Sequence, residues 1–351
     1  MSDRLKLSEL QKDWKKAYKD AVMIGQANDG YRYSTGVVAY DIALGGGLKA
    51  GTINLIVGPE SSAKTTIALK TAAQVQLINW KTGMVDPTYS DPTPVIYIDL
   101  ENTFDPDWSR ANGVILDEDA FVVVSPSYGE MMNDIVRDII SSHAAGLVII
   151  DSLEPVMSSK ENEKSAEESA GLGRRALVLN DCFRKWVSAG ISSKVSNAWQ
   201  NTTLFCINQF RDKIVMMGDP REVPGGKGQK FYSSTITYLA KGKLQKDKTS
   251  RFGMGEFSGV IDKNKTASPK KAFAFEMATM PMDNHPIGYV DNVKTIWTFV
   301  KGQSDWISKG KDGWEVFGEV YRVQDDFVDK LSDPIFYAEV RNKVYARIAG
   351  K

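Results

Sequence analysis

The segment from Gly58 to Thr66 constrains the fold of this chain more than any other part of the sequence. It reads Gly-Pro-Glu-Ser-Ser-Ala-Lys-Thr-Thr and directly follows the apolar run Ile53–Val57, which predicts a strand, a tight loop and then a helix. In such a unit the N–H groups of the loop and the helix N-terminus face phosphate oxygens. Lys64 can then reach the β- and γ-phosphates, while the Thr65 hydroxyl binds Mg²⁺. The segment therefore predicts a nucleotide site in an α/β protein.

One residue departs from the usual form of such a loop, G-x-x-x-x-G-K-[ST], because Ala63 stands where the second glycine is expected. We expect the methyl group to be tolerated if Ala63 has a negative φ and if the phosphate passes clear of its side chain. The alternative is a glycine- and serine-rich turn between a strand and a helix in some other α/β protein. The residues predicted to contact the nucleotide are Gly58, Pro59, Glu60, Ser61, Ser62, Ala63, Lys64, Thr65 and Thr66.

The composition is that of an ordinary globular protein and argues against some functions. Lys and Arg together number 44, as do Asp and Glu, so the formal net charge of zero does not suit a histone-like protein, although a local basic surface can still bind nucleic acid. We find no run of about 18 apolar residues and no signal peptide. Cys182 and Cys206 stand alone in apolar contexts, as expected for core residues of a reduced cytoplasmic protein.

Strand-like and helical runs alternate between residue 53 and about residue 210. Apolar strands that alternate with helices predict an α/β fold whose mostly parallel central sheet is covered on both faces. Ligands of such sheets bind at the carboxyl ends of the strands, where the predicted phosphate loop also lies. The expected strands are Ile53–Val57, Val95–Leu100, Ala120–Val124, Leu147–Asp151 and Thr203–Gln209, and the expected helices cover 64–79, 128–142 and 171–189.

The two ends of the chain differ from its middle. Residues 5–22 repeat apolar side chains at helical spacing, and this stripe must be buried either on the chain's own core or on a neighbouring subunit. Beyond residue 230 the pattern changes to β-runs such as Thr235–Ala240 and Ala272–Met277, and the chain ends in a helix near Pro334–Ile348. We expect an N-terminal helical oligomerisation segment at 1–34, a core at 35–287 and a small α+β domain at 288–351.

Polar side chains stand where three of the predicted strands end. The run Leu147–Asp151 is four apolar residues followed by a carboxylate, which suits Asp151 for holding Mg²⁺, often through water. Asp99 and Glu101 end another strand and project to the same face, so one of them could orient and deprotonate a water molecule. A helix cap or a solvated loop is the alternative for Glu101. Gln209 ends a further strand, and its amide can donate to a γ-phosphate.

Residues 211–230 combine basic and apolar side chains with several glycines. Arg211, Lys213 and Arg221 are among the basic residues, and Ile214 is unusually apolar for a loop. Such a segment suits single-stranded nucleic acid, because cations follow the phosphates while apolar groups intrude between bases. A simple surface loop is the alternative.

Short motifs follow one another in a fixed order and spacing. They are Thr35–Gly36, Asp41–Leu48, Gly58–Ser62, Ile98–Glu101, Ile150–Ser152, Ile207–Gln209, Gly225–Gly226 and Lys230–Tyr232. Together they resemble the motifs of bacterial RecA recombinases over roughly residues 33–275. The resemblance is weak at both ends, which together with Ala63 suggests a phage-encoded relative similar to the UvsX recombinase. It implies a RecA-type P-loop ATPase core with an N-terminal helix and a small α+β C-terminal part.

The resemblance also implies roles around a bound ATP and Mg²⁺. Glu101 matches the glutamate that activates water, Gln209 matches a γ-phosphate sensor, and Asp151 matches an aspartate linked to Mg²⁺. Asp105 and Trp108 match positions that contact adenine, with an indole in place of a smaller aromatic ring. The roles of Asp105 and Trp108 rest on the resemblance alone.

Further implied roles concern DNA and neighbouring subunits. Lys263 and Lys265 match lysines that reach the ATP of a neighbouring subunit, and Phe231 matches an interface residue that couples ATP to DNA binding. Residues 158–170 and 211–226 match two DNA-binding loops, although the first is acidic, which argues against phosphate contacts of its own. The residues implied to contact DNA are Arg174, Arg175, Arg211, Lys213, Ile214, Arg221 and Lys227, with Ile214 at a position that wedges between bases.

The resemblance implies an ATP-dependent recombinase that forms filaments on single-stranded DNA and exchanges strands with a homologous duplex. Single-stranded-DNA-binding and mediator proteins would be further partners, and a phage-encoded protein would work in the host cytoplasm. Two alternatives stay open. One is a non-hydrolysing DNA-binding filament protein, should Ala63 spoil the phosphate site. The other is a hexameric helicase or loader of the same fold, which would carry an arginine finger.

Overall fold

A computed structural model describes most of the chain from residue 30 onward. The described residues are 12, 16, 30–86, 88, 90–159, 172–189, 197–212, 221–240, 242–244, 253–282 and 285–350, with only the backbone of 172, 173, 211, 212, 221, 222 and 244. The predicted helix over 5–22 lies outside this part except for residues 12 and 16. Most of the predicted DNA-binding loop at 158–170 lies outside it as well.

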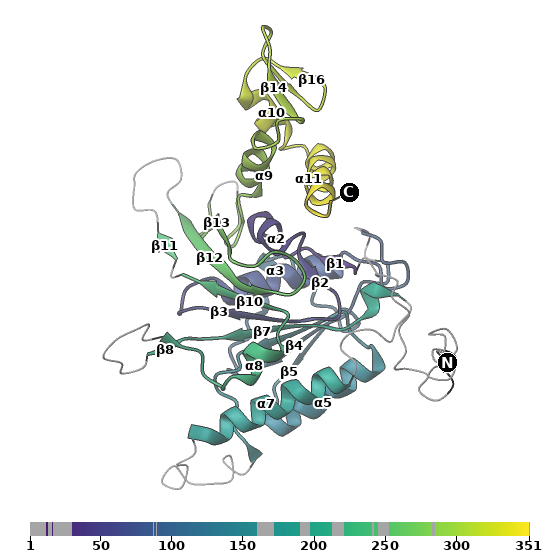
Figure 1. The fold of residues 1–351 in the computed structure, drawn as a ribbon, viewed down its shortest axis with the longest axis vertical. Coiled ribbons are helices and arrows are strands. Elements are labelled where there is room, and N and C mark those ends of the chain that lie inside the picture. Colours follow the sequence, from purple (N-terminus) through teal and green to yellow (C-terminus); the bar gives the residue numbers. More distant parts are fainter. Residues whose placement is uncertain are drawn as a thin grey trace, which may run out of the picture.

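A nine-stranded sheet forms the centre of the molecule (Figure 1). Its strand order is β11-β12-β10-β3-β7-β6-β4-β5, and β13 pairs with β12. Neighbouring strands from β10 to β5 run parallel, whereas the contacts of β12 are antiparallel, so the predicted mostly parallel sheet is confirmed. The strands are β3 (Ile53–Val57), β4 (Val95–Asp99), β5 (Phe121–Val124), β6 (Leu147–Asp151), β7 (Thr203–Asn208), β10 (Thr235–Leu239), β11 (Lys243–Leu244), β12 (Met254–Asn264) and β13 (Lys271–Ala278).

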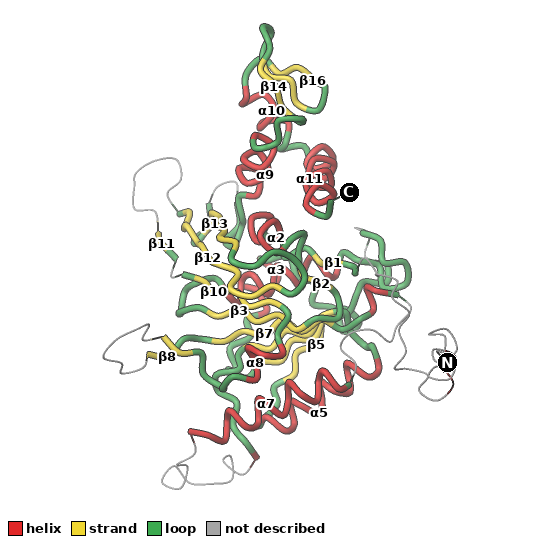
Figure 2. The backbone as a smooth tube through the Cα atoms, viewed as in Figure 1, coloured by secondary structure: helices red, strands yellow, loops and turns green. Residues whose placement is uncertain are grey.

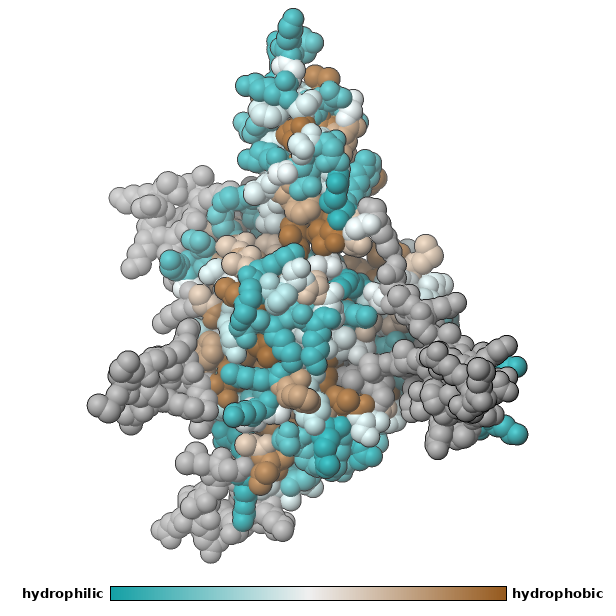
Figure 3. Space-filling model, in the orientation of Figure 1, coloured by the Kyte–Doolittle hydropathy of each residue, from teal (hydrophilic) through white to brown (hydrophobic). Residues whose placement is uncertain are grey.

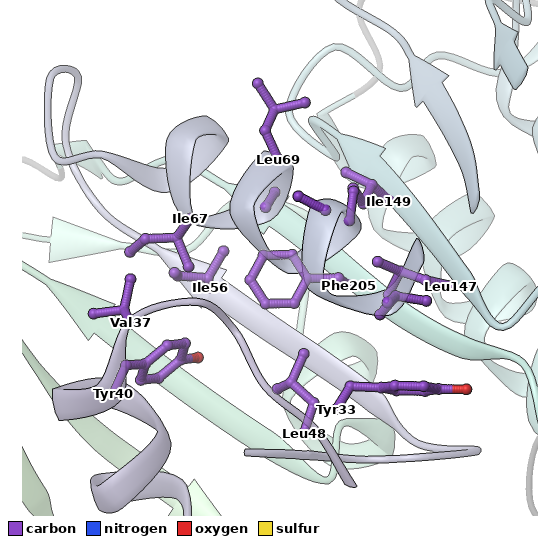
Figure 4. Close-up of a cluster of buried hydrophobic side chains, with 14 of the residues drawn as sticks. Tyr33, Val37, Tyr40, Leu48, Ile56, Ile67, Leu69, Leu147, Ile149 and Phe205 are labelled. Carbon is purple, nitrogen blue, oxygen red and sulfur yellow. The ribbon is translucent and has the colours of Figure 1, made fainter. Parts of the chain in front are cut away.

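Helices cover both faces of this sheet, so its central strands are buried on both sides. Helices α2 and α3 lie on one face and α5 and α7 on the other (Figures 1 and 2). On the first face, Ile56 and Phe205 of the sheet lie in one buried cluster with Ile67 of α3 (Figure 4). The helices of this core are α2 (Val38–Leu44), α3 (Lys64–Gln76), α4 (Pro106–Ala111), α5 (Gly129–Ser142), α7 (Leu172–Ser188) and α8 (Gly228–Tyr232).

The chain after β13 forms a small α+β unit, as predicted. It docks on α2, where Val38 and Ile42 join the apolar cluster of the unit, and Figure 3 shows apolar atoms at this junction. The Tyr345 hydroxyl also donates a 2.6 Å hydrogen bond to the buried carboxylate of Asp41. The elements of this C-terminal unit are α9 (Asn292–Lys301), β14 (Ile307–Lys309), β15 (Trp314–Val316), β16 (Glu319–Tyr321), α10 (Gln324–Lys330) and α11 (Pro334–Ile348).

The ends of the predicted elements agree with the structure to within one residue, with one exception. Helix α3 ends at Gln76 and not near residue 79. The chain turns there because Ile78 pairs with Val85 and Asn79 pairs with Pro92 in isolated bridges. Within the described residues, no helix has the length and apolar character needed to cross a membrane. Four short strands complete the description: β1 (Arg32–Tyr33), β2 (Leu48–Lys49), β8 (Arg211–Asp212) and β9 (Arg221–Glu222).

Candidate functional site

The predicted phosphate loop joins β3 to α3 and folds around its own lysine. Lys64 is the first residue of α3, and its ammonium donates a 2.7 Å hydrogen bond to the carbonyl oxygen of Pro59. The Ser62 hydroxyl donates to the same oxygen at 2.7 Å. Gly58 has no room for a side chain, because a Cβ there would lie 2.5 Å from the Ser62 hydroxyl oxygen. The backbone of the loop is therefore fixed before any ligand is bound.

The Lys64 ammonium lies in a partly buried, acidic surrounding. Burial lowers the pKa of this group, and the charges of Asp151, Glu101 and Glu60 act in the opposite direction. Its one hydrogen bond among the described residues goes to a neutral carbonyl oxygen. A phosphate oxygen would be a stronger acceptor, since charge-assisted hydrogen bonds are roughly twice as strong as neutral ones.

Ala63 does not meet the condition of a negative φ under which its methyl group was expected to be tolerated. This residue has a φ of 68° and a ψ of 20°, in the left-handed region. A residue with a Cβ is disfavoured there by about 1–2 kcal/mol, because the Cβ approaches the following carbonyl oxygen. The carbonyl of Ala63 nevertheless accepts the N–H of Ile67 at 2.9 Å and so begins the hydrogen bonds of α3. The loop thus has the conformation that glycine would favour, and alanine adopts it under strain.

Asp151 and Thr65, the two residues predicted to serve a metal, are in contact. The Thr65 hydroxyl donates a 2.8 Å hydrogen bond to Oδ2 of Asp151, and the Tyr97 hydroxyl donates to the same oxygen at 2.7 Å. Burial raises the pKa of the Asp151 carboxyl, and these two hydrogen bonds oppose that effect. Sequence reasoning missed Tyr97. Its only signal was a hydroxyl in the otherwise apolar run before Asp99.

These oxygens suit Mg²⁺, which prefers hard oxygen ligands and retains several water molecules. Among the described residues, no group of three or more His, Cys, Asp or Glu side chains could hold a metal alone. A cation beside Thr65 and Asp151 would therefore depend on nucleotide phosphates and water for its remaining ligands.

The two carboxylates at the end of β4, Asp99 and Glu101, have different environments. Asp99 is buried, and its carboxylate accepts the backbone N–H groups of Thr103 and Phe104 at 3.2 and 3.0 Å. Glu101 is exposed, and its Oε1 accepts hydrogen bonds from the Ser152 hydroxyl and, at 3.4 Å, from the Gln209 amide. Asp99 therefore supports the loop, whereas Glu101 lies beside the predicted sensor. Ser152 is a further contact that the sequence did not point to.

The two residues matched to adenine contacts lie at the start of α4. The carboxylate of Asp105 caps this helix, since its Oδ1 accepts the N–H groups of Asp107 and Trp108 at 2.9 and 3.0 Å. The Trp108 side chain is partly buried against the core cluster that includes α3. One carboxylate oxygen of Asp105, Oδ1, thus has a structural role as the cap of α4.

Lys263 lies on β12 and Lys265 directly follows it, two strands away from β3 and its phosphate loop. The N–H of Lys265 donates to the carbonyl of Ser234, and the N–H of Ser234 donates to that of Ile53, the first residue of β3. The phosphate loop instead follows Val57, the last residue of β3. Lys265 is therefore level with the start of β3, whereas Lys263 is opposite Ile236 and level with Leu55 in the middle of β3. Strand β10 lies between β12 and β3, so within one chain both lysines are separated from the phosphate loop.

Lys263 is bound to the helix that precedes β10. Its ammonium donates hydrogen bonds to the carbonyl oxygens of Lys230 and Phe231 at 2.7 and 3.0 Å. Burial and the charge of Lys265 lower the pKa of this ammonium. Phe231 itself is 70% exposed, which is unusual for so large an apolar side chain. The paired lysines and the exposed phenyl ring thus lie on one surface.

The residues matched to DNA contacts are only partly described. Arg174 is exposed on α7. Arg175 is held by the protein, through a 3.5 Å ion pair with Glu154 and a 3.2 Å hydrogen bond to the carbonyl of Val156. Lys227 is exposed at the start of α8. Arg211 and Arg221 are described by backbone alone, in β8 and β9, and Lys213 and Ile214 lie outside the described residues.

Two glycines near the end of the predicted DNA-binding loop of residues 211–226 lie against α7. Gly225 and Gly226 have φ values of 94° and 77°. A Cβ on Gly225 would lie 2.4 Å from Leu179, and one on Gly226 would lie 2.9 Å from the Cβ of Ala176. The segment at Gly225 and Gly226 therefore packs closely against the helix that carries Arg174.

Comparisons with known proteins identify a family profile and several relatives that match this chain. The profile of the family described as RecA N-terminal domain matches residues 5–280. The chain is 32% identical over 323 residues to Protein RecA of Chlorobium chlorochromatii, which covers 90% of this chain and 82% of that protein. It is 36% identical over 245 residues to Protein RecA of a Nocardioides species, covering 69% and 63%. It is 30% identical over 318 residues to Protein RecA of Rhodopirellula baltica, covering 89% and 76%.

Proposed function

This chain belongs to the RecA family, and we propose that it binds ATP with Mg²⁺ at the loop of residues 58–66 and assembles on single-stranded DNA. As a RecA-type recombinase it is a DNA-dependent ATPase that pairs a single strand with a homologous duplex and exchanges strands. The observation that carries the proposal is the meeting of Lys64, Thr65, Asp151 and Glu101 beside the carboxyl ends of β3, β4 and β6.

Each of these side chains has a proposed task. Lys64 leaves the carbonyl of Pro59 and binds the β- and γ-phosphates. Thr65 and Asp151 hold Mg²⁺, which neutralises charge on the phosphate oxygens when it is bound. Glu101 accepts the proton of the attacking water. Gln209 donates its amide N–H to the γ-phosphate, and its hydrogen bond to Glu101 connects the γ-phosphate to that base.

We propose that Asp105 and Trp108 face the adenine base. Asp105 keeps Oδ2 for the base while Oδ1 caps α4. The half-buried indole of Trp108 offers an aromatic face of the kind that stacks on bases.

Filament formation explains why Lys263 and Lys265 lie far from their own phosphate loop. We propose that they approach the γ-phosphate of a neighbouring subunit, much as an arginine finger does in trans. The exposed Phe231 would lie in the same interface. Strand β5 is an edge of the sheet among the described strands, and its exposed Val122 and Val123 are of the kind that pairs with a second chain.

DNA contact is proposed for the loop of residues 211–226 and the adjoining face of α7. Arg174 and Lys227 are exposed there and can pair with phosphates, whereas Arg175 would first have to give up its ion pair with Glu154. Ile214 would wedge between bases. We also propose single-stranded-DNA-binding and mediator proteins as partners. A cytoplasmic location and domain limits at 1–34, 35–287 and 288–351 are further proposals.

ATP hydrolysis measured with and without single-stranded DNA tests the proposal. We expect turnover that needs Mg²⁺ and rises severalfold when DNA is added, and we expect Lys64→Ala to abolish it. Strand exchange between a circular single strand and its homologous linear duplex separates a recombinase from a helicase. Tight DNA binding without hydrolysis would instead identify a non-hydrolysing filament protein.

A further inference from the structure

Tyr97 places a hydroxyl group at the centre of the nucleotide site. It is the third residue of β4, where it pairs with Ile149 of β6, and its side chain is 2% exposed. From there its hydroxyl reaches across to Asp151, two residues farther along β6, and donates a 2.7 Å hydrogen bond to Oδ2. A buried tyrosine hydroxyl usually finds one partner, and here that partner is the carboxylate proposed to serve the metal.

The two hydroxyl donors of Asp151 meet the same oxygen atom. Thr65 and Tyr97 both donate to Oδ2, and no hydrogen bond from the described residues reaches Oδ1. The carboxylate is therefore held in one rotamer with its second oxygen free. Donors of this kind behind a metal ligand fix its orientation, and their loss commonly lowers metal affinity 10–100-fold.

The ring of Tyr97 is held as firmly as its hydroxyl. It packs against Phe104 with ring centroids 5.2 Å apart and against Phe121 at 6.2 Å. Phe104 lies in the segment that leads to Asp105, and its own N–H is bound by Asp99. The hydroxyl thus stands on a fixed support, so it can orient Asp151 before any nucleotide arrives.

We propose that Tyr97 is a positioning residue for the magnesium ion, which it serves by holding Asp151 through the hydroxyl. This inference rests on the proposed Mg²⁺–ATP site. Tyr97 touches neither the metal nor the nucleotide. It determines how well Asp151 is aligned with Mg²⁺, a cation that demands near-ideal octahedral geometry.

The test is a Mg²⁺ titration of nucleotide binding in the full-length protein, followed with a fluorescent N-methylanthraniloyl derivative of ATP. Tyr97→Phe removes only the hydroxyl and keeps the ring. We expect it to raise the half-saturating Mg²⁺ concentration about 10-fold. Affinity for the probe in excess EDTA should be the same as in the wild type, since that binding does not involve the metal.

Tyr40→Phe is a matched control. Tyr40 is equally buried, and its hydroxyl pairs with Thr237 at 2.8 Å, not with a residue of the proposed site. Its Mg²⁺ dependence should stay within twofold of the wild type. Urea unfolding of both variants compares their stability. A much larger loss of unfolding free energy in Tyr97→Phe than in Tyr40→Phe would assign the hydroxyl to folding and overturn the proposal.

The outcomes separate this inference from the proposed function. If wild-type protein binds the probe without any Mg²⁺ dependence, the proposed function fails. If the wild type depends on Mg²⁺ but Tyr97→Phe has the same half-saturation, or a lower one, only the inference fails. In an Asp151→Asn background, Tyr97→Phe should add no further shift, because the group it positions is already gone.

Discussion

At the scale of single residues, hydrogen bonds decide which of several similar groups can do chemistry. Asp99 and Glu101 are two residues apart and both carry a carboxyl group, yet backbone N–H groups contact the first and side chains of the site contact the second. The backbone N–H groups of Thr103 and Phe104 thus occupy both oxygens of Asp99. Glu101 is exposed and accepts from an amide and a hydroxyl, which leaves it open to a water molecule.

Glu101→Gln should separate binding from hydrolysis. The new amide keeps one oxygen that can accept from Ser152 and Gln209, so the loop should keep its shape. We expect ATP and DNA affinity within about twofold of the wild type and turnover lower by roughly 10²–10⁴-fold, the usual contribution of a general base. Equilibrium binding and steady-state hydrolysis measure the two effects. An equal loss of ATP affinity in Glu101→Gln and Lys64→Ala would contradict this division.

Ala63→Gly should stabilise the protein. Because Ala63 has a φ of 68°, glycine would relieve a strain of about 1 kcal/mol, less the entropy that glycine gains in the unfolded chain. Urea unfolding measures the gain. Ala346→Gly is the control, since this exposed alanine lies in α11, where glycine should cost about 0.5–1 kcal/mol. Opposite signs for the two variants are expected, and a loss in both would mean that the phosphate loop is not strained.

At the scale of elements, the contact between α7 and the glycine-rich segment before α8 links the proposed DNA surface to the sheet. Gly225 and Gly226 let the chain turn with positive φ directly against Leu179 and Ala176 of this helix. The amide of Asn208, at the end of β7, then binds the carbonyl of Pro224 at 3.0 Å. One side of this segment is thus fixed to the strand that leads to Gln209, so a change at the γ-phosphate has a short route to the loop.

Gly226→Ala should lower the free energy of unfolding by more than the strain of a positive φ alone would. The added Cβ would meet that of Ala176 at 2.9 Å, in addition to the cost of a φ of 77°. Gly318→Ala is a matched control, because Gly318 has a φ of 84° but no atom within 4 Å of the new Cβ. We expect Gly318→Ala to cost about 1–2 kcal/mol of unfolding free energy.

Gly226→Ala should cost more than that control and should also reduce the stimulation of hydrolysis by DNA. Ala176→Gly, added to Gly226→Ala, should recover the steric part, which a double-mutant cycle isolates. Equal losses in Gly226→Ala and Gly318→Ala would show that the contact with α7 carries no energy.

At the scale of the whole molecule, the sheet separates two halves of one proposed active site. The phosphate loop follows the carboxyl end of β3, whereas Lys263 and Lys265 lie two strands away, level with the middle and the start of β3. Such an arrangement is complete only when a second copy joins head to tail, an interface that generates rings or open filaments. We propose the strand edge at β5 and the exposed Phe231 as surfaces for that contact.

Mixed filaments should reveal the shared site. Lys263→Ala and Lys64→Ala should each be inactive alone, the former by roughly 10³–10⁵-fold if it acts like an arginine finger. In a one-to-one mixture about one interface in four should pair an intact nucleotide pocket with intact lysines, and DNA-stimulated hydrolysis should return in part.

A mixture of Lys64→Ala with Glu101→Gln is the control for this experiment. Both defects then lie in the same pocket, so no interface is complete and no activity should return at any ratio. Light scattering or electron microscopy must confirm that the variants enter common filaments. Recovery in the control, or none in the test mixture, would contradict a site shared between subunits.

Patterns among neighbouring residues were enough to predict the local features of this protein. The α/β pattern, the loop at 58–66 and the terminal helix Pro334–Ile348 follow from the periodicity and spacing of neighbouring residues, which depend on few distant contacts. The ordered motifs were also enough to identify the family, because several short segments had to agree at once.

Contacts between residues far apart in the chain depend instead on the packing of the folded molecule. Tyr97 and Asp151 are 54 positions apart, and their hydrogen bond depends on the register of β4 against β6. The conformation of Ala63 depends on the path of the loop between strand and helix, and no pattern of residue types specified its sign of φ. The separation of Lys263 from the phosphate loop likewise arises from the pairing of β10 with both β3 and β12. Backbone register and strain belong to the packed molecule, and for that reason they could not be read from the order of residues.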